Sequence, residues 1–166
     1  MDIQGSCYCG RVHFRAVSRT PYPYMRCYCS ICRKSAGGGG YAINIMAETD
    51  SLHIEGGQHV GYHHGRIDDT DRPGHLLPSP GKRYFCSHCG SALWVADPRW
   101  PQSVYPFASA VDTALPVPPE VVHIMLDFAA PWVQVPKGDN HRHFKRYPDE
   151  SILVWHQRQG LYQGSE

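Results

Sequence analysis

Cys27-Tyr28-Cys29-Ser30-Ile31-Cys32 places three cysteines within six residues, and it is one of three cysteine clusters that say most about this chain. Two shorter clusters, Cys7-Tyr8-Cys9 and Cys86-Ser87-His88-Cys89, lie on either side of it. Thiols two or three residues apart can meet on one metal ion, whereas such close pairs rarely close unstrained disulfides. We therefore interpret all seven cysteines as candidate zinc ligands.

The number of cysteines suggests two kinds of site, since a structural zinc takes four protein ligands and a catalytic zinc takes three and an exchangeable position. Cys7 and Cys9 would point to the same face of an extended chain and make one half-site. Cys86 and Cys89, followed by Gly90, are typical of a zinc knuckle and would make the other half-site. The remaining three cysteines can hold a metal within one loop, so this triad is the candidate open site.

Spacing alone leaves the partition open. Cys29 and Cys32 could instead join Cys86 and Cys89 in an ordinary zinc ribbon and leave the other three cysteines over. All seven could also serve purely structural zinc sites, or one cluster could consist of idle free thiols.

Composition favours a single-domain protein of the cytoplasm. The chain has 166 residues, and its N-terminus has neither the basic start nor the apolar core of a signal peptide. No apolar run is long enough to span a bilayer, and reduced, metal-bound thiols fit the cytosol. Sixteen basic residues against fifteen acidic ones give a net charge of +1 without a basic stripe, which argues against a membrane or nucleic-acid partner.

Frequent glycines and prolines leave little room for long helices, so we expect a mainly β fold. Short helices are expected at 29–36 and at 149–159, the second capped by Asp149. His63-His64 and His141-Arg142-His143 are expected in solvated loops without a metal. The expected strands cover residues 11–17, 41–46, 51–55, 81–85, 92–96, 104–108, 121–126 and 132–135.

Other side chains near the cysteines are interpreted as structural. Tyr28 and His88 lie between candidate ligands, and we expect them to pack or to support the ligands. We expect His123 to be a core histidine with hydrogen-bond partners, and Trp94 and Trp132 to pack the core or edge a pocket.

The three cysteine clusters and their flanks resemble a known family. Gly5-Ser6-Cys7-Tyr8-Cys9-Gly10-Arg11-Val12-His13-Phe14, Cys27 to Lys34, and Phe85-Cys86-Ser87-His88-Cys89-Gly90-Ser91 are similar to the three signatures of the glutathione-dependent formaldehyde-activating enzyme family, which includes centromere protein V. The resemblance implies one domain over residues 1–166 with a β-tent fold of short antiparallel sheets. It implies a structural zinc on Cys7, Cys9, Cys86 and Cys89, a second zinc on Cys27, Cys29 and Cys32, and therefore two zinc ions per chain.

The resemblance also implies a zinc-dependent carbon-sulfur lyase that adds a glutathione-like thiol to a small aldehyde such as formaldehyde. The triad would hold the catalytic zinc, and Arg33 and Lys34 could meet a carboxylate of the thiol. The name-giving members carry Trp-Lys-Pro where this chain has Arg33-Lys34-Ser35, so the thiol and the aldehyde are left open. Two alternatives are a non-catalytic zinc module that docks a partner and a thiol redox or metal sensor.

Overall fold

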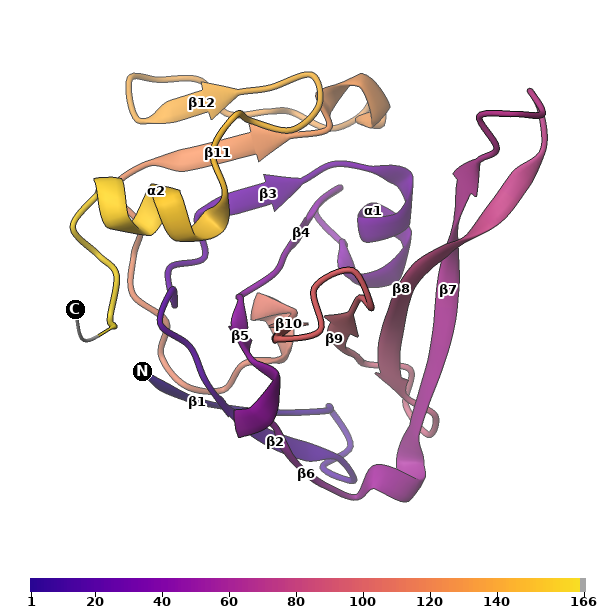
Figure 1. The fold of residues 1–166 in the computed structure, drawn as a ribbon, viewed down its shortest axis with the longest axis vertical. Coiled ribbons are helices and arrows are strands. Elements are labelled where there is room, and N and C mark those ends of the chain that lie inside the picture. The colour runs from indigo at the N-terminus through magenta and orange to yellow at the C-terminus, as the bar shows by residue number, and fades with distance from the viewer. Residues whose placement is uncertain (165–166) are drawn as a thin grey trace.

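The computed structural model describes residues 1–164 as three small β-sheets and two short α-helices (Figure 1). The predicted mainly β fold with few short helices is confirmed. Two of the sheets are antiparallel, and the third contains both parallel and antiparallel pairs. Single 3₁₀ turns occupy Thr49–Ser51 (η1), Gly57–His59 (η2), Ala108–Ala110 (η3) and Leu126–Phe128 (η4).

The first sheet has the order β1-β2-β6 and is built from Asp2–Ser6 (β1), His13–Val17 (β2) and His53–Glu55 (β6). Inward and outward residues alternate along β1 and β2, as expected for strands with one buried face. Gly5 lies directly opposite Phe14, and a Cβ on Gly5 would come within 2.3 Å of the Phe14 ring. The missing side chain therefore lets the ring fill the core.

The second sheet has the order β5-β10-β9-β8-β7. Its strands are Ala47–Glu48 (β5), Ser103–Pro106 (β10), Ala92–Ala96 (β9), Leu76–Cys86 (β8) and Val60–Asp68 (β7). The main core lies between this sheet and the first, where the Phe14 and Trp94 rings meet edge to face at 5.6 Å. The outer parts of β7 and β8 project from the body as a hairpin (Figure 1).

The third sheet has the order β12-β11-β3-β4. Its strands are His141–His143 (β12), Val121–Ile124 (β11), Met25–Cys27 (β3) and Ala42–Ile43 (β4). Helix α2 (Ile152–Arg158) covers a second core, where the buried Trp155 stacks on Tyr24 with ring centroids 3.7 Å apart. Helix α1 (Ser30–Ala36) directly follows β3 and lies against β7, because Ile31 packs on Gly65.

Several predicted boundaries are wrong. The stretch 132–135 is not a strand, because the Val133 amide donates to the Ala130 carbonyl in a turn and Trp132 is 62% exposed. Helix α2 is capped by Ser151, whose hydroxyl accepts from the Val154 amide, so Asp149 is not the cap.

Other elements were missed by the sequence prediction. The two histidine motifs, expected in loops, lie in β7 and β12. The predicted strand at 81–85 extends back to Leu76 despite Pro78 and Pro80. That outer part of β8 pairs only with β7, so prolines cost no hydrogen bond on its open edge. Strands β1 and β3 were not expected.

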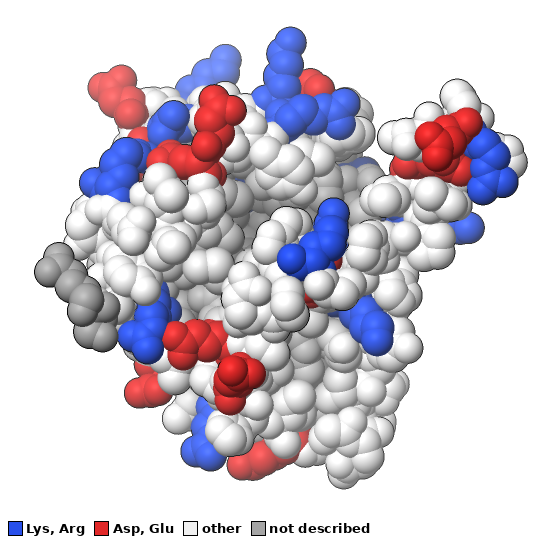
Figure 2. Space-filling model, viewed as in Figure 1, with Lys and Arg blue, Asp and Glu red and all other residues white. Residues whose placement is uncertain are grey.

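The distribution of charged side chains on the surface agrees with the near-neutral net charge. Figure 2 shows acidic and basic side chains interspersed on this face, without a stripe of one sign. Within residues 1–164, no helix is both long and apolar enough to cross a membrane.

Candidate metal centres

The first group of thiols joins the N-terminal sheet to the central sheet. Cys7 and Cys9 lie in the turn after β1, while Cys86 ends β8 and Cys89 lies in the turn before β9. All four Sγ atoms lie within 4.8 Å of one another. The Cys7 and Cys9 sulfurs are 3.5 Å apart, and the Cys9 and Cys86 sulfurs are 3.8 Å apart. Four thiols are thus gathered from two distant segments.

Two glycine turns shape this group. Gly10 and Gly90 both have a positive φ, 72° and 77°, which side chains other than glycine rarely adopt. The Gly10 amide donates to the Cys7 carbonyl at 3.0 Å, and the Gly90 amide donates to the Cys86 carbonyl at 2.8 Å. Each turn therefore folds its cysteine pair back toward the opposite pair.

The sulfur positions fit a tetrahedral zinc. With Zn–S bonds of about 2.3 Å, the sulfurs of a tetrahedral site lie about 3.8 Å apart, whereas a disulfide would need about 2 Å. All seven cysteines are free thiols, and the Cys7–Cys9 and Cys9–Cys86 separations are close to the first value. Hydrogen bonds from the hydroxyl and the amide of Ser91 lower the pKa of Cys89 to about 5, which favours a thiolate there.

The second group of thiols lies where β3 runs into α1. Cys27 ends β3, Cys29 is the N-cap residue of α1, and Cys32 lies in the first turn of that helix. The Cys32 amide donates to the Cys29 sulfur at 3.4 Å, so the cap itself positions two thiols. The three sulfurs lie within 4.8 Å of one another, and no fourth cysteine, histidine or acidic ligand from residues 1–164 joins them.

The three thiols of the triad strongly shift one another's pKa. Hydrogen bonds from the thiols of Cys27 and Cys32, together with the Cys32 amide, lower the pKa of Cys29 to about 2. The same contact with Cys29, followed by the contact with Cys32 and by burial, raises the pKa of Cys27 well above its usual range. One thiolate is therefore formed easily, and a cation is needed to hold the other two.

The structure groups the cysteines in one of the ways that spacing allowed. Cys29 and Cys32 do not lie with Cys86 and Cys89, so the ribbon partition is not formed. Metal binding by either group stays a prediction.

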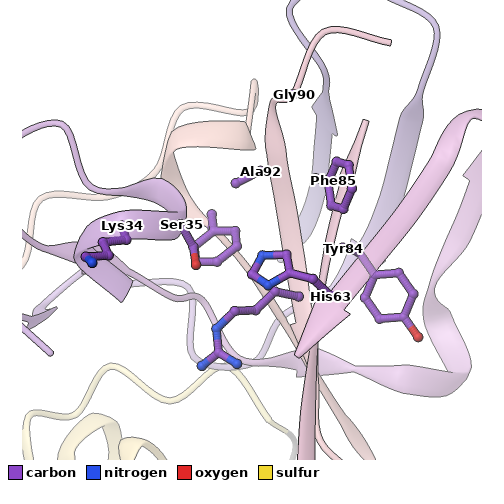
Figure 3. Close-up of a pocket in the computed structure, with 9 residues that line it drawn as sticks. Lys34, Ser35, His63, Tyr84, Phe85, Gly90 and Ala92 are labelled. Carbon is purple, nitrogen blue, oxygen red and sulfur yellow. The ribbon is translucent and has the colours of Figure 1, made fainter. Parts of the chain in front are cut away.

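A cavity of about 290 Å³ adjoins the triad, between α1 and strands β7, β8 and β9. Its wall includes Lys34, Ser35, His63, Arg83, Ala92 and Phe107. Figure 3 shows Ser35 and the His63 ring near one another, while the Lys34 side chain extends away from them. Of the two residues predicted to bind substrate, Lys34 contributes to this wall, whereas Arg33 does not.

The Tyr28 side chain contacts the third sheet through His123 of β11. Its buried hydroxyl is 2.8 Å from His123 Nδ1, and His123 Nε2 is 2.9 Å from His141 Nδ1. The expectation that His123 is a core histidine with hydrogen-bond partners is confirmed. His88 is exposed, between two ligands of the first group.

Two side chains near the triad were missed by sequence reasoning. A hydrogen bond with Cys27 acts to lower the pKa of Cys32, but contact with Cys29 and burial raise it to about 12, and the charge of Arg83, on β8, opposes part of this rise. Tyr147, from the C-terminal segment, is 70% exposed, yet partial desolvation and then the charges of the three triad sulfurs raise its pKa. Neither residue lies in a cysteine motif, so only the folded chain reveals this proximity.

A mainly β chain with one group of four thiols and one of three belongs to the class of proteins whose cysteine clusters could hold metal ions. The family model described as glutathione-dependent formaldehyde-activating enzyme matches residues 2–127. A Halomonas elongata protein, provisionally named a glutathione-dependent formaldehyde-activating enzyme, is 54% identical over 164 residues, which are 99% of this chain and 100% of that protein. The chain therefore belongs to the glutathione-dependent formaldehyde-activating enzyme family.

One solved structure is also similar. It is a crystal structure of a Rhodobacter sphaeroides protein, a structural-genomics target, with 22% identity and a TM-score of 0.47. The similarity covers 68% of this chain and 91% of that one.

Proposed function

We propose that this protein is a zinc-dependent carbon-sulfur lyase that reversibly adds a glutathione-like thiol to formaldehyde or another small aldehyde. The observation that carries the proposal is the triad of Cys27, Cys29 and Cys32, which offers three sulfurs and no fourth ligand from residues 1–164. Family membership and the name of the Halomonas relative support the same substrates. We further propose a single domain over residues 1–166, acting in the cytoplasm with two zinc ions per chain.

The triad has the donor set that such chemistry needs. Zinc bound to three thiolates would lower the pKa of an incoming thiol and hold it as a thiolate. The substrate sulfur then attacks the aldehyde carbon, so a C–S bond forms, the C=O π bond breaks, and the thiol proton ends on the new hydroxyl. The reverse reaction releases aldehyde and thiol.

The residues of the chain have separate parts in this scheme. Cys27, Cys29 and Cys32 would hold the zinc as thiolates, and the buried partners of Tyr28 hold the loop between Cys27 and Cys29 in place. The four-cysteine group on Cys7, Cys9, Cys86 and Cys89 would hold the sheets together and take no part in the reaction.

The test combines metal content with exchange kinetics. Wild-type protein purified without added metal is expected to carry two zinc ions per chain and to accelerate exchange between ¹³C-formaldehyde and S-hydroxymethylglutathione, measured by NMR. Cys29→Ser is expected to carry one zinc and to show only the spontaneous rate, while Ser30→Ala serves as a matched control in the same loop. Exchange by Cys29→Ser at the wild-type rate would contradict the proposal.

A further inference from the structure

The cavity beside the triad is positively charged. Its wall contains Arg83, Lys34 and His63 but no aspartate or glutamate. At about 290 Å³ it lies at the lower end of the range for small-molecule sites, so it suits one arm of a substrate more than a whole cofactor. An anionic arm is the partner that such a wall favours.

The cavity and the triad are neighbours, although none of the three cysteines lines the cavity wall. Ala92 and Phe107 line the cavity, and the same two residues pack in one apolar cluster with Cys32. Ser35, also in the wall, lies one helical turn after Cys32 on α1. A molecule whose sulfur reaches the triad can therefore place another group in this cavity.

The guanidinium group of Arg83 has no carboxylate partner among residues 1–164. It forms no ion pair with residues 1–164, and its one hydrogen bond runs from Nη1 to the Gly81 carbonyl at 3.3 Å. Its Nε is buried and has no hydrogen-bond partner. The neighbouring carboxylate of Asp97 is occupied by Arg99, which donates to it at 2.9 Å and 2.7 Å.

A buried guanidinium donor left without an acceptor costs free energy and calls for an explanation. The fork of an arginine matches the two oxygens of a carboxylate, and the pairing is strong where water is partly excluded. A ligand carboxylate would satisfy Nε and a terminal nitrogen at once. The Arg83 side chain is thus one half of an ion pair, and a ligand carboxylate would be the other half.

We propose that Arg83 binds a carboxylate of the thiol substrate and so makes the enzyme specific for small thiols that carry a carboxylate on an arm away from the sulfur. This assignment rests on the proposed function of the triad, because it places the substrate sulfur there. Neutral thiols without such an arm would leave Arg83 unpaired and react poorly.

The test measures binding without chemistry. S-methylglutathione has no free thiol and cannot react, so its dissociation constant for the zinc-loaded full chain, measured by calorimetry, reports the cavity alone. Arg83→Gln is expected to weaken binding by roughly tenfold or more, the loss typical of a charge-assisted hydrogen bond. Esterifying the ligand carboxylates is expected to weaken binding to the wild type and to remove the difference between wild type and variant.

Lys82→Gln is the matched control. Lys82 directly precedes Arg83 on β8 and points to the other face, where its Nζ lies 4.5 Å from the centre of the Tyr62 ring. We expect it to bind S-methylglutathione as the wild type does. Arg83→Lys, which keeps the charge but loses the fork, is expected to bind with intermediate strength and serves if Arg83→Gln does not fold.

The outcomes separate this proposal from the previous one. If the wild type does not bind S-methylglutathione, or if Lys82→Gln weakens binding as much as the Arg83 variants do, the carboxylate site is overturned. If the wild type binds it through Arg83 but does not accelerate formaldehyde exchange, the lyase proposal fails and the carboxylate site stands.

Discussion

Acid should destabilise this protein through His123. The ring is fully buried, and burial first, then the positive charges of His143, Arg26 and His141, lower its pKa to about 4. The unfolded chain binds the proton near pH 6.5, so stability is lost as the pH falls from there toward 4. The whole difference is worth about 3 kcal/mol, of which about 2 kcal/mol is lost between about pH 7.5 and about pH 5.

Urea unfolding of the wild type and of His123→Gln at those two pH values measures this loss. Glutamine does not titrate, so the variant should lose about 2 kcal/mol less than the wild type on acidification, whatever its stability at neutral pH. Protonation of the cysteine groups affects both proteins alike, and His53→Gln, at an exposed position on β6, should behave as the wild type does. Parallel losses in the wild type and in His123→Gln would refute the reasoning.

Three further outcomes are expected. Trp155→Ala removes a fully buried ring stacked on Tyr24 and should cost about 3–5 kcal/mol in chemical denaturation, and a loss below 1 kcal/mol would show that α2 contributes little. Gly56→Ala would place a Cβ 1.8 Å from the Arg11 carbonyl oxygen, at a backbone φ of 76°. It should lower the melting temperature more than Gly10→Ala does, because Gly10 has a similar φ but open space around its Cα. Equal losses in the two variants would contradict this. A strong zinc chelator should lower the melting temperature of the wild type by at least about 5 °C, because the four-cysteine group joins two sheets, and an unchanged melting curve would exclude a structural zinc.

The grouping of the cysteines was only partly readable from the sequence. Short spacing within each cluster identified candidate ligands, because residues two or three apart are held close by the local backbone. Which cluster meets which depends on how the first sheet and the second come together, and that contact involves long-range packing such as Phe14 against Trp94. Resemblance to a family supplied this information where spacing could not.

Strand prediction failed where pairing overrides local preference. The outer part of β8 contains Pro78 and Pro80, which usually mark a break, but only one of its edges is paired there. The stretch 132–135 has apolar residues that favour a strand. The Val133 amide, however, donates to the Ala130 carbonyl in a turn, so it is not available for pairing with another strand. Arg83 could not be recognised at all, since its place in the cavity depends on the partner strands of β8.

The two thiol groups differ in when they can form during synthesis. The triad spans six consecutive residues, so it can take up a metal as soon as that stretch leaves the ribosome. The other group requires Cys9 and Cys86 to meet across 77 positions, which needs much of the second sheet to be made first. A nascent chain would therefore pass through a stage in which the triad segment is complete while Cys7 and Cys9 still lack Cys86 and Cys89, and oxidants or competing metals would have access to Cys7 and Cys9 in this interval.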